Sequence, residues 1–245
     1  MSYETYNFTK KEKWIVMIQW FAICGVIGYF FYKSWIAFIG LVLFMPFFIK
    51  WRKKAFFKKR QWELTLAFRE AVGMVSGNLQ AGNSVENAFR RTHGDLVRLY
   101  GEEADISLEF LTIGRGLDRN MLLENLLMDF GNRSGVEDIK EFADIFSVAK
   151  RSGGNLREII ADTAEAISSK TEMKRELRIL ISEKQFEQKI MCVIPFFILA
   201  YIGMTSPGYF DSLYHNISGI GIMTACLSAY AAAIWWGMKI TEIEV

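Results

Sequence analysis

The chain has 245 residues, of which 51% are hydrophobic and 23% are charged, and its 29 Lys and Arg nearly balance its 27 Asp and Glu. The apolar residues gather in two blocks, 14–49 and 190–238, while the 140 residues between them hold 46 of the 56 charged side chains. This segregation excludes an ordinary soluble globule, a fibrous repeat and a disordered chain. It predicts a multi-pass membrane protein with one substantial water-exposed domain.

The first apolar block is predicted to be a hairpin of two short spans. It has 36 residues and one charge, Lys33, and a helix needs about 20 residues to cross the hydrocarbon core. Aromatic residues flank Lys33, which is typical of a membrane interface. We therefore expect spans at 14–32 and 35–49 after a cytoplasmic N-terminus, residues 1–13. One span followed by an interfacial helix is the alternative.

The second apolar block divides in the same way. Residues 190–206 are uncharged, and Pro207 and Gly208 then interrupt the run with turn formers. Residues 217–238 are again uncharged, and a short tail, 239–245, follows. The sequence thus predicts four transmembrane helices in two hairpins.

Lys and Arg lie mostly on one side of these predicted spans, because the outer turns hold only Lys33. Seven of them fall in the segment 50–60, and others stand directly before the first and third spans and after the fourth. By the positive-inside rule, both termini and the central domain are expected in the cytoplasm. The basic juxtamembrane segment 50–60 is expected to lie on anionic membrane lipid, and no nucleic acid is expected as a partner.

The central domain, 61–189, is predicted to be an antiparallel bundle of about six helices, which makes the chain an all-α membrane protein. Apolar residues recur at intervals of three and four along three stretches, and this is the spacing of one helix face. The three faces are Leu64, Ala67, Phe68, Ala71, Val75 and Leu79; Ile139, Phe142, Ala143, Phe146 and Ala149; and Leu156, Ile159, Ile160, Thr163 and Ile167.

Glycines and asparagines mark the predicted helix ends. Asn83 with Glu86, and Asn155 with Glu158, have the spacing of a capping box with Asn in place of Ser or Thr. They predict two helix starts, and the helix from Asn155 is expected to continue toward the membrane. Helix breaks are expected near Gly82, Gly94, Gly101, Gly114–Gly116, Gly131–Gly135 and Gly153–Gly154.

The residues offer no constellation for catalysis, a metal or a cofactor. No Gly-rich loop ends in Gly-Lys-Ser or Gly-Lys-Thr, so no P-loop for ATP is predicted. Two histidines, His93 and His215, are too few for a zinc site or a Ser-His-Asp triad. The three cysteines, Cys24, Cys192 and Cys226, lie in the apolar blocks without metal-ligand spacing. We therefore expect a protein that is not an enzyme.

Acidic residues are frequent in the central domain. Most are expected on the solvated faces of amphipathic helices, and contact with a basic partner or a divalent ion stays open for a minority. Examples are Glu102, Glu103, Asp105, Glu137, Asp138, Glu141 and Asp144.

The C-terminal spans carry two features of helix packing. Small residues recur at every fourth position, at Gly221, Ala225, Ala229 and Ala233, and such a stripe lets another helix approach closely. That helix could belong to this chain or to another, and exposure to lipid is the alternative. Pro195 removes one backbone donor from the third span and predicts a kink.

Two helix-start elements have a distinctive order relative to the predicted spans. The first, Leu79–Phe89, contains Gly82 and Ser84, and the second, Ser152–Ile160, contains Gly153, Gly154, Asn155, Leu156 and Glu158. A charged helix, 170–189, and the last two spans follow. From about Phe68 to its C-terminus the chain resembles the F-type (GspF) platform proteins of type II secretion and type IV pilus systems. Most narrowly, it resembles the TadB/TadC pair of the tight-adherence (Tad/Flp) pilus, and its ending is closer to TadB.

The resemblance implies a non-enzymatic platform in the inner membrane of a bacterial cell. Such proteins are thought to couple a cytoplasmic ATPase to the insertion of pilin subunits into a growing filament. The implied partners are that ATPase, pilin, and a second F-type protein or a second copy of this chain, because larger members have two such domains. The two helix-start elements are the residues expected to serve coupling, and capping alone is the alternative.

Two other functions stay open at this point. A membrane subunit of an ATPase-driven transporter would be expected to place ionisable residues inside its spans, and these spans have none. A membrane-anchored enzyme or signalling protein would need a clustered nucleophile and base in the central domain. The sequence shows no such cluster, so both are less favoured than the platform.

Overall fold

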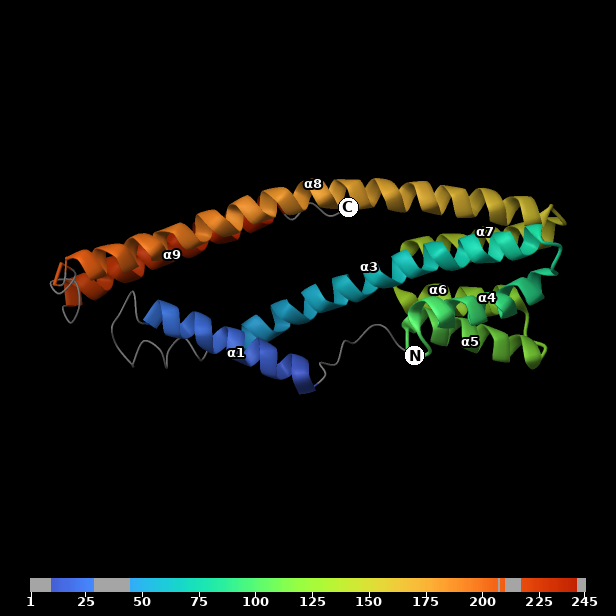
Figure 1. Cartoon of the computed structure of the whole chain (residues 1–245), viewed down its shortest axis with the longest axis horizontal. Coiled ribbons are helices and arrows are strands. Elements are labelled where there is room, and N and C mark those ends of the chain that lie inside the picture. Colours follow the sequence, from blue (N-terminus) through green and yellow to red (C-terminus); the bar gives the residue numbers. More distant parts are fainter. Residues whose placement is uncertain (1–9, 29–44, 207, 210–216, 242–245) are drawn as a thin grey trace. The chain divides into compact units, whose positions relative to one another are not determined.

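The computed structural model describes residues 10–28, 45–206, 208–209 and 217–241 (Figure 1). Within these ranges every regular element is a helix, which confirms the all-α prediction for the described part of the chain. The helices are α1 (Lys10–Ile27), α3 (Met45–Gln80), α4 (Val85–Tyr100), α5 (Asp105–Asp118), α6 (Leu123–Ser134), α7 (Glu137–Ser152), α8 (Leu156–Thr205) and α9 (Ile217–Thr241).

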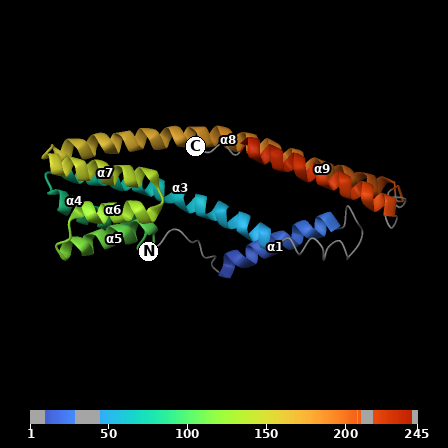
Figure 2. The same cartoon turned by 180° about the vertical axis from the view of Figure 1, so that it is seen from behind.

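The chain forms two compact units, and Lys54–Met173 makes up the described part of the first. We call this unit the bundle, and it contains six helical segments: the later part of α3, the whole of α4 to α7, and the first part of α8. Helix α4 packs on α5, α5 on α6 and α6 on α7. The connecting turns are short, so successive helices run antiparallel (Figures 1 and 2).

The helix faces that the sequence predicts on α3, on α7 and in part on α8 belong to the bundle core, which also takes residues from α4, α5 and α6. The six predicted residues of α3, from Leu64 to Leu79, are each at most 6% exposed, and the five predicted residues of α7 are each at most 5% exposed. On α8, Ile160 and Ile167 are buried and Leu156 packs against the core from its edge.

Six phenylalanines connect five helices inside this core. Phe68 of α3 makes edge contacts with one ring of α6 and one of α7, and a ring of α4 stacks on a ring of α5. Such pairs add about 0.5–1.5 kcal/mol each beyond the burial of their area. The contacts run Phe130–Phe68–Phe142–Phe146–Phe89–Phe110, with ring centroids between 5.5 and 6.4 Å apart.

Four of the glycines at the expected helix breaks lie inside helices, and one of them, Gly114 of α5, has nothing within 4 Å of its Cβ position. Gly94 is in the middle of α4, and that predicted break is wrong. Gly116 lies inside α5, where a Cβ would stand 2.6 Å from Leu126 Cδ2. Gly131 lies inside α6, where a Cβ would stand 3.0 Å from the Cα of Lys140 in α7. The last two glycines therefore permit close helix approach rather than ending helices.

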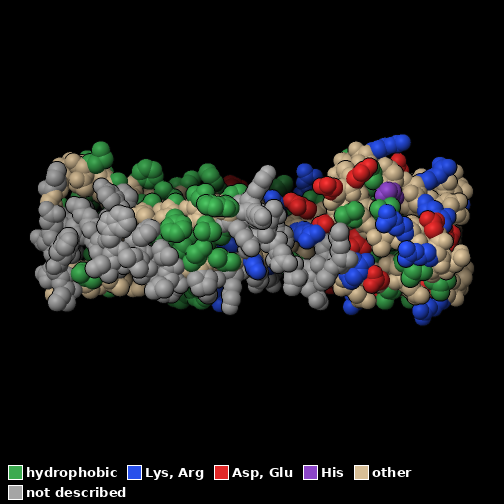
Figure 3. All heavy atoms as spheres, turned by 90° about the horizontal axis from the view of Figure 1, so that it is seen from below, with side chains coloured by type: hydrophobic (Ala, Val, Ile, Leu, Met, Phe, Trp, Pro, Cys, Tyr) green, Lys and Arg blue, Asp and Glu red, His purple; other side chains and the backbone are tan. Residues whose placement is uncertain are grey.

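The second unit holds the apolar helices. By length and composition, the described residues contain two helices able to cross a membrane, Leu156–Thr205 and Ser218–Ile240, and a shorter apolar helix, Trp14–Ile27. Much of the expected first hairpin, with spans 14–32 and 35–49, falls on residues 29–44, which lie outside the described residues. Figure 3 shows charged side chains over the bundle and hydrophobic side chains over this unit.

Helices α8 and α9 meet in this second unit. The Tyr230 hydroxyl donates a hydrogen bond to the carbonyl of Cys192, and the Tyr230 ring lies 5.8 Å from that of Phe196. A Cβ at Gly237 would stand 2.4 Å from Gln188 Nε2, so glycine there admits the glutamine side chain.

The predicted small-residue stripe of α9 takes no part in that contact. Gly221, Ala225, Ala229 and Ala233 are all exposed. Its role in contact with another helix stays a prediction. Helix α8 continues through Pro195 to Thr205 without a break.

We expect Gly131→Ala to destabilise the bundle. The new methyl group would press on the backbone of α7, and overpacking costs about 1–3 kcal/mol, which exceeds the helix-propensity gain of about 1 kcal/mol. Pulse proteolysis of the full chain in mild detergent across a urea series measures the change. Gly94→Ala is the matched control, because nothing lies within 4 Å of its Cβ, and it should stabilise by about 0.5–1 kcal/mol. Equal stabilisation by both variants would contradict the close approach.

Candidate partner-docking site

Three turns of the bundle form one end, which we call the turn end. They are residues 81–84, 119–122 and 153–155. Because successive helices alternate in direction, α4, α6 and α8 begin at this end and α3, α5 and α7 finish there (Figure 1). The two helix-start elements that the sequence singles out therefore lie at the same end of the bundle.

The first turn closes α3 with a glycine and an asparagine. Gly82 has a φ of 89°, in the region that L side chains avoid. The side-chain amide of Asn83 donates to the carbonyl oxygen of Asn78 at 2.8 Å. Asn83 therefore completes the end of α3.

Helix α4 is capped by Ser84. The Ser84 hydroxyl oxygen accepts a hydrogen bond from the backbone N–H of Asn87 at 3.4 Å. The sequence places the cap one residue earlier, in the pair Asn83 and Glu86, and that assignment is wrong because the Asn83 side chain already bonds to α3. Gly82 and Ser84 are both exposed.

The third turn joins α7 to α8 at Gly153 and Gly154. Gly153 has a left-handed φ of 69°, and the Gly154 N–H donates to the Ala149 carbonyl oxygen at 3.2 Å. The side-chain amide of Asn155 donates a hydrogen bond to Glu158 Oε2 at 3.2 Å. The two residues of the predicted pair are therefore in contact, and Asn155 is the donor. Both residues of the pair and both glycines are exposed, and Leu156 beside them is half-buried.

The second turn adds a feature that the sequence analysis missed. Asn120 has a positive φ of 59°. After it, Met121 and Leu122 are 49% and 53% exposed. A surface hollow of about 300 Å³ opens beside them, and it lies between the start of α4, the α5–α6 turn and the end of α7. The residues that line it are Glu86, Arg90, Leu117, Asn120, Met121, Leu122, Leu123 and Lys150.

Two ion pairs cross the turn end. Arg90 of α4 lies 3.0 Å from Asp118 of α5, and Lys150 of α7 lies 3.0 Å from Glu124 of α6. The exposed Arg90–Asp118 pair contributes about 0–1 kcal/mol, whereas the Glu124 side chain of the second pair is only 16% exposed. Both pairs align neighbouring helices around the hollow.

The opposite end of the bundle, which we call the ion-pair end, holds the buried charges. Arg133 of α6 binds both carboxylate oxygens of Glu109 of α5, at 2.9 and 2.8 Å, and Glu109 is 3% exposed. The hydrogen bond to Glu109 raises the pKa of Arg133, partly opposed by burial. The guanidinium therefore stays charged at any physiological pH.

Lys170 of α8 makes the second buried pair of the ion-pair end. Its Nζ lies 2.6 Å from Asp138 and 3.0 Å from Glu141, and Asp138 is 2% exposed. The expectation of a solvated helix face is thus wrong for Asp138. Hydrogen bonding to Asp138 and then to Glu141 raises the pKa of Lys170 above its ordinary 10.5. The resulting stabilisation is fully present below that ordinary value and is lost only as the pH rises through the folded-state pKa.

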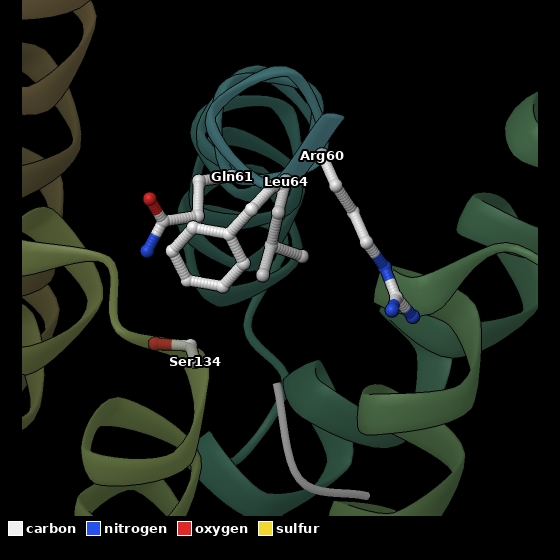
Figure 4. A pocket seen from close by; sticks show the side chains of 5 residues that line it. Arg60, Gln61, Leu64 and Ser134 are labelled. Carbon is white, nitrogen blue, oxygen red and sulfur yellow. The ribbon is translucent and has the colours of Figure 1, made fainter. Parts of the chain in front are cut away.

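Arg60 of α3 completes the ion-pair end. Its guanidinium makes two hydrogen bonds of 2.6 Å to Asp105, and the neighbouring Gln61 donates to the carbonyl oxygen of Gly135 at 2.9 Å. Figure 4 shows a small cavity beside these residues and Ser134, with a volume of about 10 Å³. That space holds at most about one water molecule, so it is not a ligand site.

Among the described residues, no group of three or more His, Cys, Asp or Glu side chains could hold a metal ion. The family model of type II secretion system (T2SS), protein F matches residues 71–204, more than half of the chain. This range includes all three turns of the turn end. Comparisons with curated proteins and with solved structures give no match.

Removing the guanidinium of Arg133 should destabilise the bundle strongly. Arg133→Met leaves the buried Glu109 carboxylate without its cation, which costs about 3–5 kcal/mol, and pulse proteolysis in urea measures the loss. Lys59→Met is the control, because its partner Glu63 is 62% exposed and that pair contributes about 0–1 kcal/mol. The double variant Arg133→Met, Glu109→Met should recover much of the loss. Equal effects of the two single variants would contradict a buried pair.

Proposed function

The chain belongs to the family of type II secretion system protein F, and we propose that it is the platform protein of a type IV (Tad/Flp) pilus or of a type II secretion assembly. In this role it couples a cytoplasmic ATPase to the extraction of pilin subunits from the membrane and to filament assembly. Within the family we propose a TadB-like member, on the order of the helix-start elements, the charged helix and the last two spans.

The observation that carries this proposal is one continuous family match that runs from the bundle into the apolar part of α8. The match covers residues 71–204, and α8 is a single helix of 50 residues from Leu156 to Thr205. At 1.5 Å per residue, its axis is about 75 Å long. Its first turn belongs to the turn end and its last turns are apolar. A partner that acts on the turn end therefore acts on the helix that enters the membrane.

Protein F family members are inner-membrane proteins, and the two long apolar helices agree with that location. We extend this to four spans at 14–32, 35–49, 190–206 and 217–238, with both termini and the bundle in the cytoplasm. The support is the Lys and Arg distribution, which favours one side of every span.

The proposed role requires no chemistry from this chain. The ATPase hydrolyses the nucleotide, and the platform transmits displacement through packed helices. We therefore propose a non-enzymatic protein without a cofactor. Its membrane partners would be pilin and a second F-type protein or a second copy of the chain, since this chain has one such domain.

Cysteine labelling tests the proposed topology. In a variant with the three native cysteines replaced by alanine, Lys33→Cys should react with a membrane-impermeant maleimide in spheroplasts, because it lies in the first outer turn. Glu137→Cys, on the exposed surface of α7, should react only after permeabilisation. Labelling of both positions from outside would overturn a cytoplasmic bundle, and protection of Lys33→Cys would overturn the first hairpin.

Partner recovery tests the function itself. Purification of the tagged chain from its native membrane in mild detergent should yield a secretion-type ATPase, a second F-like protein and a prepilin, identified by mass spectrometry. Deletion of the protein should abolish the filament or the secretion. Recovery of a solute-binding protein or transporter subunits instead would overturn the platform and favour a transporter subunit.

A further inference from the structure

The charges of the bundle are distributed unequally between its two ends. Within 86–91, 115–124 and 150–158, which surround the turn end, seven Lys and Arg face four Asp and Glu. Two of the seven, Arg90 and Lys150, pair with carboxylates. The side chains of the other five have no interaction partner among the described residues, and we call them the unpaired arginines. They are Arg91, Arg115, Arg119, Arg151 and Arg157.

The rest of the bundle differs sharply. Among the described Lys and Arg side chains of the bundle that lie away from the turn end, all but one have an interaction partner. The exception is Lys140. At the ion-pair end, Arg60, Arg133 and Lys170 each bind a carboxylate. Unsatisfied positive charge is therefore concentrated on one surface, and a partner of opposite charge would be attracted to it.

The same surface carries the hollow, whose lining residues are half apolar and half polar or charged. Met121 and Leu122 expose about half of their area at its rim, and Leu117 and Leu123 form buried parts of its wall. A volume of about 300 Å³ is at the lower limit for small-molecule pockets, about 300–1,000 Å³. A hollow with apolar residues in its wall, on a surface that also carries the unpaired arginines, has the anatomy of a protein interface, where one anchoring side chain enters a pocket and charges form the rim.

We propose that the turn end binds an acidic segment of a partner protein, and that one large apolar side chain of this segment enters the hollow beside Met121 and Leu122. The unpaired arginines then bind the carboxylates that flank the anchor. The residues lining the hollow include no aromatic ring, and aromatic rings are what single-stranded nucleic acids stack on, so a protein fits better than a nucleic acid. This inference deepens the proposed function, on which it rests, by giving the chemistry of the cytoplasmic partner.

Site-specific photocrosslinking in the native membrane tests this inference. The full-length chain would carry p-benzoylphenylalanine in place of Met121 or of Leu122, and the crosslinked peptide would be identified by mass spectrometry. Leu99 is the matched control position. Its side chain is also apolar and 58% exposed, but it lies in the last turn of α4, at the other end of the bundle. The expected adduct, formed from position 121 or 122 and not from 99, contains an acidic segment with a large apolar residue.

Charge reversal provides the second measurement. Arg119→Glu should lower the yield of this adduct about fivefold, because attraction at the rim becomes repulsion. Lys140→Glu makes the same change of charge on an exposed residue away from the turn end and should leave the yield unchanged. Replacing the crosslinked partner's carboxylate with arginine should restore the yield in the Arg119→Glu chain.

The remaining outcomes overturn the inference. They are an adduct with a second copy of this chain, with lipid, with nuclease-sensitive material or with a neutral or basic segment, and equal losses from Arg119→Glu and Lys140→Glu. Absence of an adduct from 121 and 122, while the secretion-type ATPase still co-purifies, overturns this surface and leaves the platform function standing. If the adduct contains an acidic segment of a protein outside any secretion assembly, and the charge exchange restores its yield, the binding surface is supported and the platform function is overturned.

Discussion

The series of six phenylalanine rings is the interaction on which the bundle depends. It begins at Phe130 on α6 and ends at Phe110 on α5, and consecutive rings belong to neighbouring helices or to neighbouring turns of α7. Loss of a buried phenylalanine side chain costs about 3–5 kcal/mol, a large part of a typical folding free energy of about 5–15 kcal/mol. Because each ring contacts a ring of another helix, the helices cannot slide independently. The turns between them are thereby held in register.

The buried faces of α3 and α7 were predicted correctly from the sequence, because helix periodicity is a local property. The predicted residues of α3 and α7 are all buried, and Gly82, Gly101, Gly135 and Gly153 end or follow helices as expected, with positive φ. The role of a glycine inside a helix depends instead on its neighbour in space. Gly94 faces open space, whereas Gly131 faces the backbone of Lys140. The sequence does not distinguish these two glycines, and the predicted helix break at Gly94 was wrong for that reason.

Charged residues show the same limit more strongly. Glu109 and Arg133 are 24 residues apart, and no local spacing relates them. In the sequence, Asp138 resembles any solvated acidic residue of an amphipathic helix. Only the fold shows that it pairs with Lys170 of α8. The candidate site was foreseen in two of its three turns, because glycine and capping residues mark them. The turn with Met121 and Leu122 has no such marker, and its hollow exists only where three helices meet.

The two ends of the bundle differ in what their charged residues do. Those of the ion-pair end stabilise the fold, and those of the turn end form the proposed partner surface. Buried charges demand partners, because an ion without one in the interior costs several kcal/mol, and at the ion-pair end Glu109 and Asp138 are both satisfied within the chain. At the turn end the unpaired arginines are exposed to solvent, so leaving them without carboxylates costs little in the isolated protein. Those arginines gain most when a partner brings carboxylates and excludes water. The fold can therefore keep a partner surface at the turn end without weakening its core. Since α8 starts at that surface and continues as one helix into its apolar part, binding there would act on the helix that the proposed topology places in the membrane.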